Sequence, residues 1–396
     1  MPPISRAWSR LKRRVLLRPR IFANPNFIPI PPDVKVEEEA LPDYLPARYY
    51  PVRIGEVFAG RYQVVGKLGF GASSTVWLAH DLTRFTYAPR ALGERVGNEI
   101  AVYKRMEQRA SSHPGRGAVR TLLDSFRVDG PDGQQHLVLA HPPLGQSVER
   151  AIRCSSPRRL TAFGVRFVLK DLFLALEYLH DECQIADNIM FGITDPSVFT
   201  DFEEEEVHNP CPRKEVDGRT IYTSRAIRST GILGPPVLCH FGSAVFGDSS
   251  ERLECVQPNV YRAPEVTLRA PWDYKIDIWN VGCMRAKAWD IYERSQLFHG
   301  IDPEHHAYRR RAHLAEITAL LGPPPKDLLA RGRLASKFFS DEGTFTAGIG
   351  LPAPTSLEEM ETHLAGGEKR RFPKLHAEDA SVGFSTTQHC WRAVPR

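Results

Sequence analysis

Hydrophobic and polar positions alternate with a period of two along much of the first part of the chain. The stretches RYQVVGKLGFG (61–71) and STVWLAHDL (74–82) both show this alternation, which predicts two strands joined by a β-hairpin around Gly69 and Gly71. Helical spacing follows in NEIAVYKRMEQRA, residues 98–110. A further strand is predicted in HLVLAHPPLG, which ends at prolines. The first part of the chain is therefore rich in strands.

Beyond residue 150 helical patterns replace the strands. VRFVLKDLFLALEYLHDE (165–182) is apolar on most of its faces, which is typical of a helix buried in a core. Strands followed by helices predict an α+β fold with two lobes. We place a small antiparallel β lobe at about residues 55–141 and a mainly helical lobe at about residues 142–350.

Three other segments lack these patterns. Residues 1–54 combine a basic start with a proline-rich linker and are predicted to be disordered. The acidic stretch at residues 195–230 interrupts the helical lobe and is predicted to be a solvated insertion loop. A binding role for Glu203 to Glu206 within it stays open. Residues 351–396 form a divergent tail.

Composition and charge exclude several function classes. The chain has 396 residues, of which 42% are hydrophobic, and no apolar run is long enough to span a bilayer, so we expect no membrane-spanning role. A net charge of +5 is modest for this length and does not argue for direct nucleic-acid binding. The seven cysteines include no C-x-x-C pair, which indicates reduced thiols and no zinc site.

The basic start of the chain has two interpretations. MPPISRAWSRLKRRVLLRPR contains no acid and interleaves basic with apolar residues, which is the make-up of a mitochondrial presequence. A disordered basic tail or a nuclear-import patch has the same composition. The sequence does not decide between them.

A glycine-rich motif lies between the first two predicted strands. KLGFGASSTVW (67–77) fits the pattern G-x-G-x-x-[G/S]-x-V, in which small residues let backbone N–H groups approach phosphate oxygens. Any tight hairpin uses glycine, so the motif alone is weak. Its strand–turn–strand context favours a kinase-type loop over a Rossmann or Walker loop. The candidate nucleotide-binding residues are Leu68, Gly69, Phe70, Gly71, Ser73, Ser74 and Val76.

Four later segments occur in the order that a kinase requires. They are EYLHDECQIADNIMFG (177–192), VLCHFGSAV (237–245), VYRAPEVTL (260–268) and YKIDIWNVGCM (274–284). Together they resemble the C-lobe of eukaryotic protein kinases, and Arg262 before A-P-E resembles the CMGC group. GEVFAGRY (55–62) is similar to a phrase of the SR-protein kinases, and NPCPRKEVDGRTIY (209–222) resembles their fungal members.

This resemblance implies a two-lobed kinase fold, ATP and magnesium as cofactors, and transfer of the ATP γ-phosphate to serines of Arg/Ser-rich proteins. It also implies a monomer in the cytoplasm and nucleus, the mitochondrion being the alternative that the basic start suggests. Beyond about residue 350 the resemblance ends, which implies that the helical lobe is incomplete. Glu265 of A-P-E then lacks its usual arginine partner, and Arg285 and Lys287 are basic residues where the family's central helix stays apolar.

Several catalytic positions of the family are altered in this chain. Glu99 matches the helix glutamate, but no lysine occurs between Lys67 and Lys104 to pair with it. Arg90 lies near the lysine's place, yet Pro89 removes a strand hydrogen bond and a guanidinium does not simply replace an ammonium.

The predicted catalytic loop is shortened. The sequence passes directly from ECQI to ADNIM, so about six residues of the family pattern are absent, the catalytic aspartate among them. Asn188 matches the metal asparagine of the family, and Asp187 matches the residue just before it.

His240 stands where the family has the metal-binding aspartate. Magnesium takes oxygen ligands, so a neutral imidazole is a poor substitute, and a packed histidine is the simpler interpretation. We therefore expect this chain to be an SR-protein-kinase-like protein without appreciable kinase activity. Two alternatives stay open: a pseudokinase scaffold that binds partners with or without nucleotide, and an unstable product of misjoined exons.

Overall fold

The computed structural model describes residues 17–354, apart from gaps at 73, 84–85, 94–96, 110–111, 148–149, 151–161, 184–187, 193–194, 229–233, 240, 245, 247–251, 254, 274–275, 278 and 281–297. The side chains of 84–97 and 181–194, and of a few single residues, also lie outside the description. The chain divides into two compact units. The first comprises residues up to 107, 119–147 and 189–242, and the second comprises 108–118, 148–188 and 243 onward.

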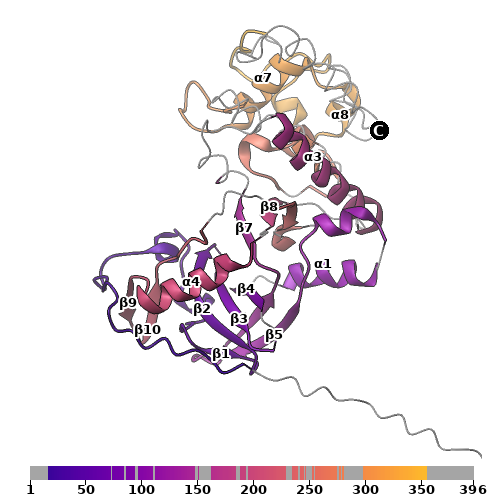
Figure 1. Ribbon diagram of the computed structural model, residues 1–396. Helices are drawn as coiled ribbons and strands as arrows, with labels where there is room; N and C mark the ends of the chain where they lie inside the picture. The colour runs from indigo at the N-terminus through magenta and orange to yellow at the C-terminus, as the bar shows by residue number, and fades with distance from the viewer. Residues whose placement is uncertain are drawn as a thin grey trace, which may run out of the picture. The chain divides into compact units, whose positions relative to one another are not determined.

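A six-stranded antiparallel sheet forms the body of the first unit (Figure 1). The strand order is β1-β2-β3-β4-β6-β5. The strands are β1 (Val57–Phe58), β2 (Tyr62–Phe70), β3 (Thr75–Asp81), β4 (Thr86–Gly93), β5 (Asp124–Asp129) and β6 (Gln135–Ala140). The predicted hairpin is confirmed, because Phe70 on β2 lies opposite Thr75 on β3. A three-stranded sheet, β11-β8-β7, completes the unit with β7 (Leu144–Ser147), β8 (Asn188–Gly192) and β11 (Pro236–Cys239).

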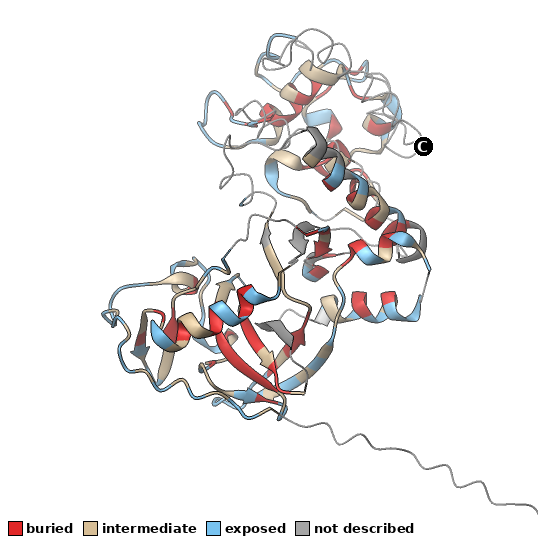
Figure 2. Cartoon of the chain, viewed as in Figure 1, coloured by how far each residue is buried: buried red, intermediate tan, exposed pale blue. Residues whose placement is uncertain are grey.

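The helix predicted at residues 98–110 is α1 (Gly97–Gln108). Val102, Tyr103 and Met106 are buried, as their spacing predicts. Hydrophobic residues also cover both sides of the central strands of the sheet. Val64 and Trp77 belong to one core cluster, whereas Val65 and Leu78 belong to another. Figure 2 shows this concentration of buried positions on the sheet.

The acidic insertion is not the solvated loop that the sequence predicts. It contains helix α4 (Ser197–His208) and a hairpin of β9 (Arg213–Val216) and β10 (Arg219–Tyr222). Val198, Phe199 and Phe202 on α4 pack against Val65 and Leu78 of the sheet. The prediction was wrong because it rested on the acidic composition. The apolar positions of this segment have helical spacing, which places them on one face of a helix.

Residues 17–54, here called the strap, also differ from the prediction, since a disordered linker was expected. The strap contains two short 3-10 helices, η1 (Glu37–Ala40) and η2 (Pro46–Arg48), and it exchanges backbone hydrogen bonds with β9 at Arg213. In Figure 1 its indigo trace passes beside α4, β9 and β10. Its proline-rich composition excludes long regular elements but not docking onto a folded surface.

The second unit is mainly helical, as predicted. Its elements are η3 (Pro114–Ala118), α3 (Ala162–Glu177), the π-helical turn η4 (Tyr178–Cys183), η6 (Asn259–Tyr261), α5 (Pro264–Leu268), α7 (Arg310–Leu321), α8 (Lys326–Arg331) and η7 (Ala335–Lys337). Gly115 of η3 allows a close approach to α3, because a Cβ there would lie 1.7 Å from the Leu174 carbonyl oxygen. A core cluster that includes Leu268, Leu314 and Leu328 joins α5, α7 and α8.

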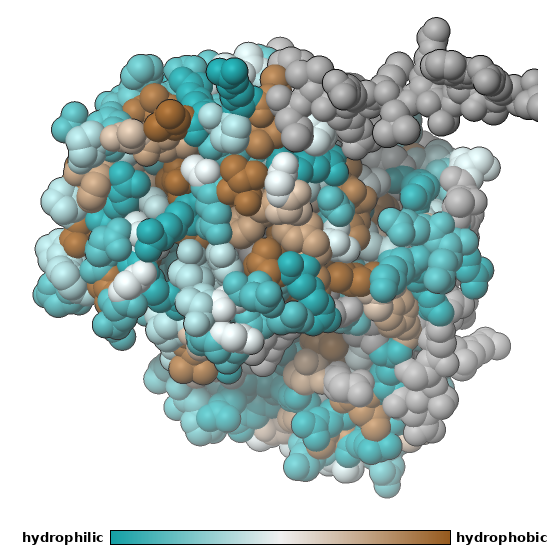
Figure 3. Space-filling model, turned by 90° about the horizontal axis from the view of Figure 1, so that it is seen from below, coloured by the Kyte–Doolittle hydropathy of each residue, from teal (hydrophilic) through white to brown (hydrophobic). Residues whose placement is uncertain are grey.

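On the face seen in Figure 3, hydrophilic side chains are interspersed with smaller groups of hydrophobic ones. Among the described helices none is long and apolar enough to cross a membrane. Residues 1–16 of the basic start and residues 355–396 of the tail lie outside the described residues.

Candidate nucleotide and phosphoryl-transfer site

The glycine-rich hairpin connects β2 and β3. Gly71 donates its N–H to the carbonyl of Ser74 at 2.8 Å and closes the tip. Phe70 is 40% exposed there, while Leu68, Ser74 and Val76 are half-buried and Ser73 lies outside the described residues. Gly69 has no atom within 4 Å of an added Cβ and no positive φ. The fold itself therefore does not require glycine at this position, which is consistent with space left for a ligand.

The position of the family's lysine lies on β4. Arg90 is opposite Trp77 on β3 and Ala140 on β6, while its side chain lies outside the described residues. Lys67 on β2 does not replace the missing lysine. Its side chain is 1% exposed, and its Nζ lies 2.5 Å from Glu38 and 3.4 Å from Glu37 of the strap. This lysine is therefore committed to the strap, a role that sequence reasoning missed.

Glu99 lies on the first turn of α1, as the sequence predicts. Burial raises the pKa of its carboxyl group, and the positive charge of Arg120 acts in the opposite direction. Its neighbour Asn98 donates from Nδ2 to the Gly242 carbonyl at 3.2 Å.

Residues just after β11 pack against α1. Phe241 begins the short helix η5 (Phe241–Ser243), and its ring meets the ring of Tyr103 edge-on at 5.6 Å between centroids. Asn98 and Tyr103 therefore hold α1 to the H-F-G segment. The structure brings Glu99 and this segment together, as they would be in a kinase.

The shortened catalytic loop follows the end of a long helix. Helix α3 continues into the π-helical turn η4, which ends at Cys183, and β8 begins at Asn188. Only residues 184–187 lie between these elements, and they are outside the described residues, as is the Asn188 side chain. A π-helical turn at the end of a helix is uncommon and marks a local irregularity.

Buried His180, within this turn, contacts Asp277 with 2.8 Å between Nε2 and Oδ2. Burial raises the pKa of Asp277, and the His180 imidazole opposes that effect. The pair ties the end of the helix to the Ile276–Asp277 segment. Sequence reasoning did not identify this pair, because its two residues lie 97 positions apart and no local pattern links them.

The residues present do not fit a magnesium site of the kinase type. His240, at the aspartate position, lies outside the described residues, and its neighbours Cys239 and Phe241 are buried. An imidazole and the single amide of Asn188 offer one oxygen donor, whereas magnesium takes oxygen ligands in near-octahedral geometry. No carboxylate in the sequence replaces the missing aspartate beside Phe241.

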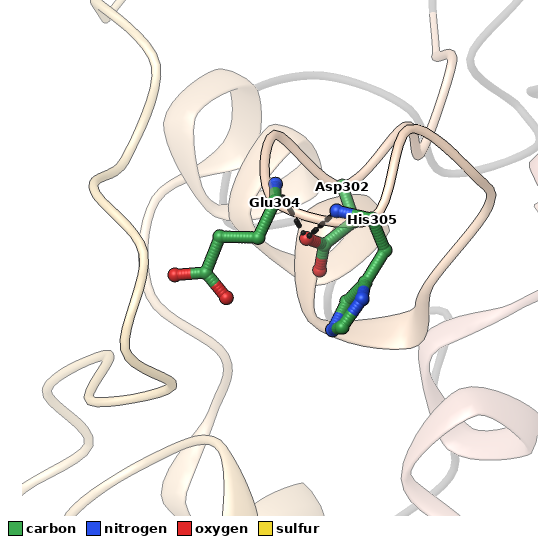
Figure 4. Close-up of side chains that lie close together, drawn as sticks. All are labelled: Asp302, Glu304 and His305. Atoms are coloured by element: carbon green, nitrogen blue, oxygen red, sulfur yellow. Dashed lines mark hydrogen bonds between the residues drawn. The ribbon is translucent and has the colours of Figure 1, made fainter.

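One cluster of metal-ligating side chains occurs among the described residues, and it lies in the second unit. It consists of Asp302, Glu304 and His305 (Figure 4). Asp302 accepts hydrogen bonds from the backbone N–H groups of Glu304 and His305 at 3.0 and 3.2 Å. Arg311 donates to Asp302 at 2.5 and 3.0 Å, and also to Glu304. The Arg311 guanidinium holds the pKa of Asp302 well below its usual range. Because the oxygens of Asp302 are bound by Arg311 and by two backbone N–H groups, the cluster stabilises this loop.

Glu265 is the buried acid of the A-P-E segment, and the loss of its arginine partner stays a prediction, because residues 281–297 and 355–396 lie outside the described residues. Glu265 on α5 is 3% exposed, and its Oε2 has no hydrogen-bond partner among the described residues. Burial raises the pKa of Glu265 to about 7, although Arg331 attracts its charge. Arg285 and Lys287 lie outside the described residues.

The acidic run on α4 is largely neutralised within the first unit. Glu203 and Glu206 are buried, so the binding role considered for Glu203 to Glu206 is wrong for these two residues. Glu206 is bound by Arg225 at 3.0 Å. Half-buried Glu204 forms a bidentate pair with Arg20 of the strap at 2.6 and 2.8 Å.

The antiparallel sheet with its glycine-rich hairpin, Glu99 on α1 and the helical second unit are together the architecture of a eukaryotic protein kinase. A solved kinase domain has this fold, with a TM-score of 0.58, 18% identity, and coverage of 80% of this chain and 91% of that one. No family model matches the chain.

Curated relatives carry the identification further. A serine/threonine protein kinase of Aspergillus fumigatus is 36% identical over 94% of this chain and 92% of its own length. The SRPK of Physarum polycephalum is 25% identical over 87% of this chain and 85% of its own length. SRSF protein kinase 3 of Mus musculus is 34% identical over 38% of this chain and 27% of its own length. The chain belongs to the SR-protein kinase family of serine/threonine protein kinases.

Proposed function

We propose that this chain is a catalytically incomplete SR-protein kinase that acts by binding partners rather than by transferring phosphate. One observation carries the proposal: the turn after α3 ends at Cys183 and β8 begins at Asn188, which leaves four residues for the catalytic loop. The one acid among those four, Asp187, directly precedes Asn188. Asp187 is therefore too close to Asn188 to take the place of the family's general base, and the four residues leave no other acid for that role.

The expected loss of rate is large. Removal of a general base alone costs about 10²–10⁴-fold. The absent lysine and metal carboxylate remove stabilisation of the charge that develops on the transferring phosphoryl group, which is usually the largest contribution to such catalysis. Lys67 gives no compensation, because the strap binds it.

Nucleotide binding is a separate matter from catalysis. The family uses ATP and magnesium, and in this chain the backbone of the glycine-rich hairpin would hold the phosphates. A nucleotide would supply the phosphoryl group, but the donor set at residues 188 and 240 does not fit magnesium. Binding that is independent of magnesium is therefore expected.

A phosphorylation assay tests the proposal. The full chain is incubated with radiolabelled ATP, magnesium and an Arg/Ser-rich peptide, with the Aspergillus fumigatus relative as the positive control. We expect no incorporation above that of a boiled sample. Robust incorporation that Asn188→Ala abolishes would overturn the proposal.

The second candidate function is an active serine/threonine kinase for Arg/Ser-rich proteins. Family membership favours it, because relatives across the full length are named as kinases. The same assay decides between the two functions. A nucleotide-dependent rise in melting temperature would separate a binding scaffold from an unstable chain, because only a native state that binds is stabilised.

A transcript read across residues 87–93, 185–186 and 284–289 tests the misjoined-exon alternative. Codons for a lysine in the first interval and an aspartate in the second would restore an ordinary kinase. A read that matches the present sequence supports the incomplete form.

A further inference from the structure

The strap reaches the tip of the glycine-rich hairpin. Tyr49 is buried, at 4% exposure, and its hydroxyl donates a hydrogen bond of 3.0 Å to the carbonyl oxygen of Gly71. Gly71 uses its own N–H to bind the Ser74 carbonyl at 2.8 Å. The peptide group before Gly71 is thus held by the hairpin, and the peptide group after it is held by the strap.

Tyr49 is itself held in place by the insertion. Arg219 on β10 donates to the carbonyl oxygens of Pro46 and Tyr49. The Tyr49 ring packs on Tyr44 with 5.3 Å between centroids. Because both its backbone and its ring are fixed, the hydroxyl is directed at Gly71 by a rigid support.

A second connection lies four residues before Gly71 on β2. The Nζ of buried Lys67 contacts Glu38 of the strap at 2.5 Å and donates to the Tyr222 carbonyl at 3.0 Å. The backbone carbonyl of Lys67 accepts a bond of 2.8 Å from the N–H of Arg225. The strap and the insertion therefore hold β2 through both its side chain and its backbone.

We propose that Tyr49 is a positioning residue, whose hydroxyl fixes the Gly71 peptide group and thereby sets the conformation of the glycine-rich hairpin and its affinity for nucleotide phosphates. Glycine-rich segments have many accessible conformations, so a ligand that must order one binds less tightly. The strap removes that cost before a ligand arrives. The part of this inference that concerns affinity rests on the proposed nucleotide role of the hairpin, and the part that concerns conformation does not.

Hydrogen exchange of the full chain, followed by mass spectrometry, tests the conformational part. Tyr49→Phe removes the hydroxyl that binds Gly71, and Tyr50→Phe is the matched control. The Tyr50 hydroxyl donates to Glu56 at 2.7 Å and not to the hairpin. We expect peptides covering residues 66–77 to exchange about fivefold faster in Tyr49→Phe, the factor that corresponds to one net hydrogen bond of about 1 kcal/mol, and at the wild-type rate in Tyr50→Phe.

Three results would overturn the inference. They are unchanged exchange in Tyr49→Phe, equal acceleration in both variants, and acceleration in Tyr49→Phe that extends equally to β5 and β6, since the last would indicate a general loss of stability. None of these readouts requires catalysis or bound nucleotide.

Binding of a fluorescent ATP analogue without magnesium tests the affinity part. We expect affinity to fall about fivefold in Tyr49→Phe and to stay constant in Tyr50→Phe, because the same hydrogen bond is at stake. Faster exchange with unchanged affinity would overturn the link to nucleotide. If the wild type binds no analogue, the nucleotide role in the proposed function fails, while the exchange result still decides the positioning role.

Discussion

Buried charge is handled differently in the two units of this chain. In the first unit Lys67 is paired with Glu38, and Lys214 is paired with Glu39 at 2.9 Å. Buried Glu206 on α4 is paired with Arg225. In the second unit Glu265 is buried with one carboxylate oxygen that has no hydrogen-bond partner among the described residues.

The difference follows from which segments surround each charge. In the first unit the strap and the insertion supply the partners, so these two additions to the sheet are part of its core. In the second unit Glu265 lies on α5, and residues 281–297 and 355–396, which follow it in the chain, lie outside the described residues. An uncompensated buried charge is costly, so a protein either pairs it or protonates it. The first unit pairs these charges, whereas in the second unit, where buried Asp302 is paired with Arg311, burial shifts Glu265 toward its protonated form.

The largest expected effect is the loss of the Lys67 pair. Lys67→Met leaves Glu38 buried without its partner and should lower the free energy of unfolding by about 3–5 kcal/mol in a urea titration. Lys104→Met on the exposed side of α1 is the control and should change it by less than about 0.5 kcal/mol. Adding Glu38→Met to Lys67→Met should recover part of the loss. Equal behaviour of the two lysine variants would contradict the pairing.

Glu265→Gln should change how stability depends on pH. The pKa of Glu265 in the folded state is raised from 4.5 to about 7, so the folded protein keeps a proton that the unfolded chain releases. The contribution of Glu265 to the free energy of unfolding is therefore fully present below about pH 4.5. It is lost as the pH rises to about 7, which lowers the free energy of unfolding by about 3 kcal/mol in all. Glu265→Gln should remove this decline and be more stable than the wild type at pH 8.

Glu342→Gln is the control for that measurement. Glu342 is exposed, and its hydrogen bond with Ser340 lowers its pKa, so its titration falls below the range studied. Unfolding measured between pH 5 and pH 8 should follow the wild type in this variant. A wild-type stability that stays constant across the range would show that Glu265 is paired after all.

Gly66→Ala tests the docking of α4 on the sheet. A Cβ at Gly66 would lie 2.8 Å from Phe202 Cε1, so Phe202 must move, at a cost of about 1–3 kcal/mol. Gly69→Ala on the same strand meets no atom within 4 Å and should leave stability nearly unchanged. Thermal unfolding of both variants checks this. Equal melting temperatures would indicate that α4 does not pack on β2.

The smallest effect is expected for Arg20→Gln at the beginning of the strap. Both partners of the Arg20–Glu204 pair are partly exposed, at 34% and 45%. Exposed ion pairs contribute little and are screened by salt, so any drop in melting temperature should disappear at high ionic strength. A drop as large as that of Lys67→Met would mean that this ion pair, and not buried Glu38 of η1, holds the strap.

Much of the fold could be predicted from sequence, because its signals are local. The glycine-rich hairpin follows from alternating residues around two glycines, and α1 and α3 follow from helical spacing. Glu99 was identifiable because it matches the helix glutamate of the family that the chain resembles. The strap and α4 were not predicted, because proline and acid content describe how a segment behaves alone and say little about the surface on which it docks.

The sequence by itself determined the patterns that predict the strands, the helices and the order of the motifs, and its resemblance to the SR-protein kinases predicts the loss of a lysine, a shortened catalytic loop and a histidine in place of the metal-binding aspartate. Only the tertiary structure decided that Lys67 belongs to the strap, that Tyr49 holds Gly71, and that Glu203 and Glu206 are buried. The Tyr49–Gly71 and Lys67–Glu38 contacts join residues 22 and 29 positions apart. Burial and pairing depend on what packs around a side chain, and no local pattern records that.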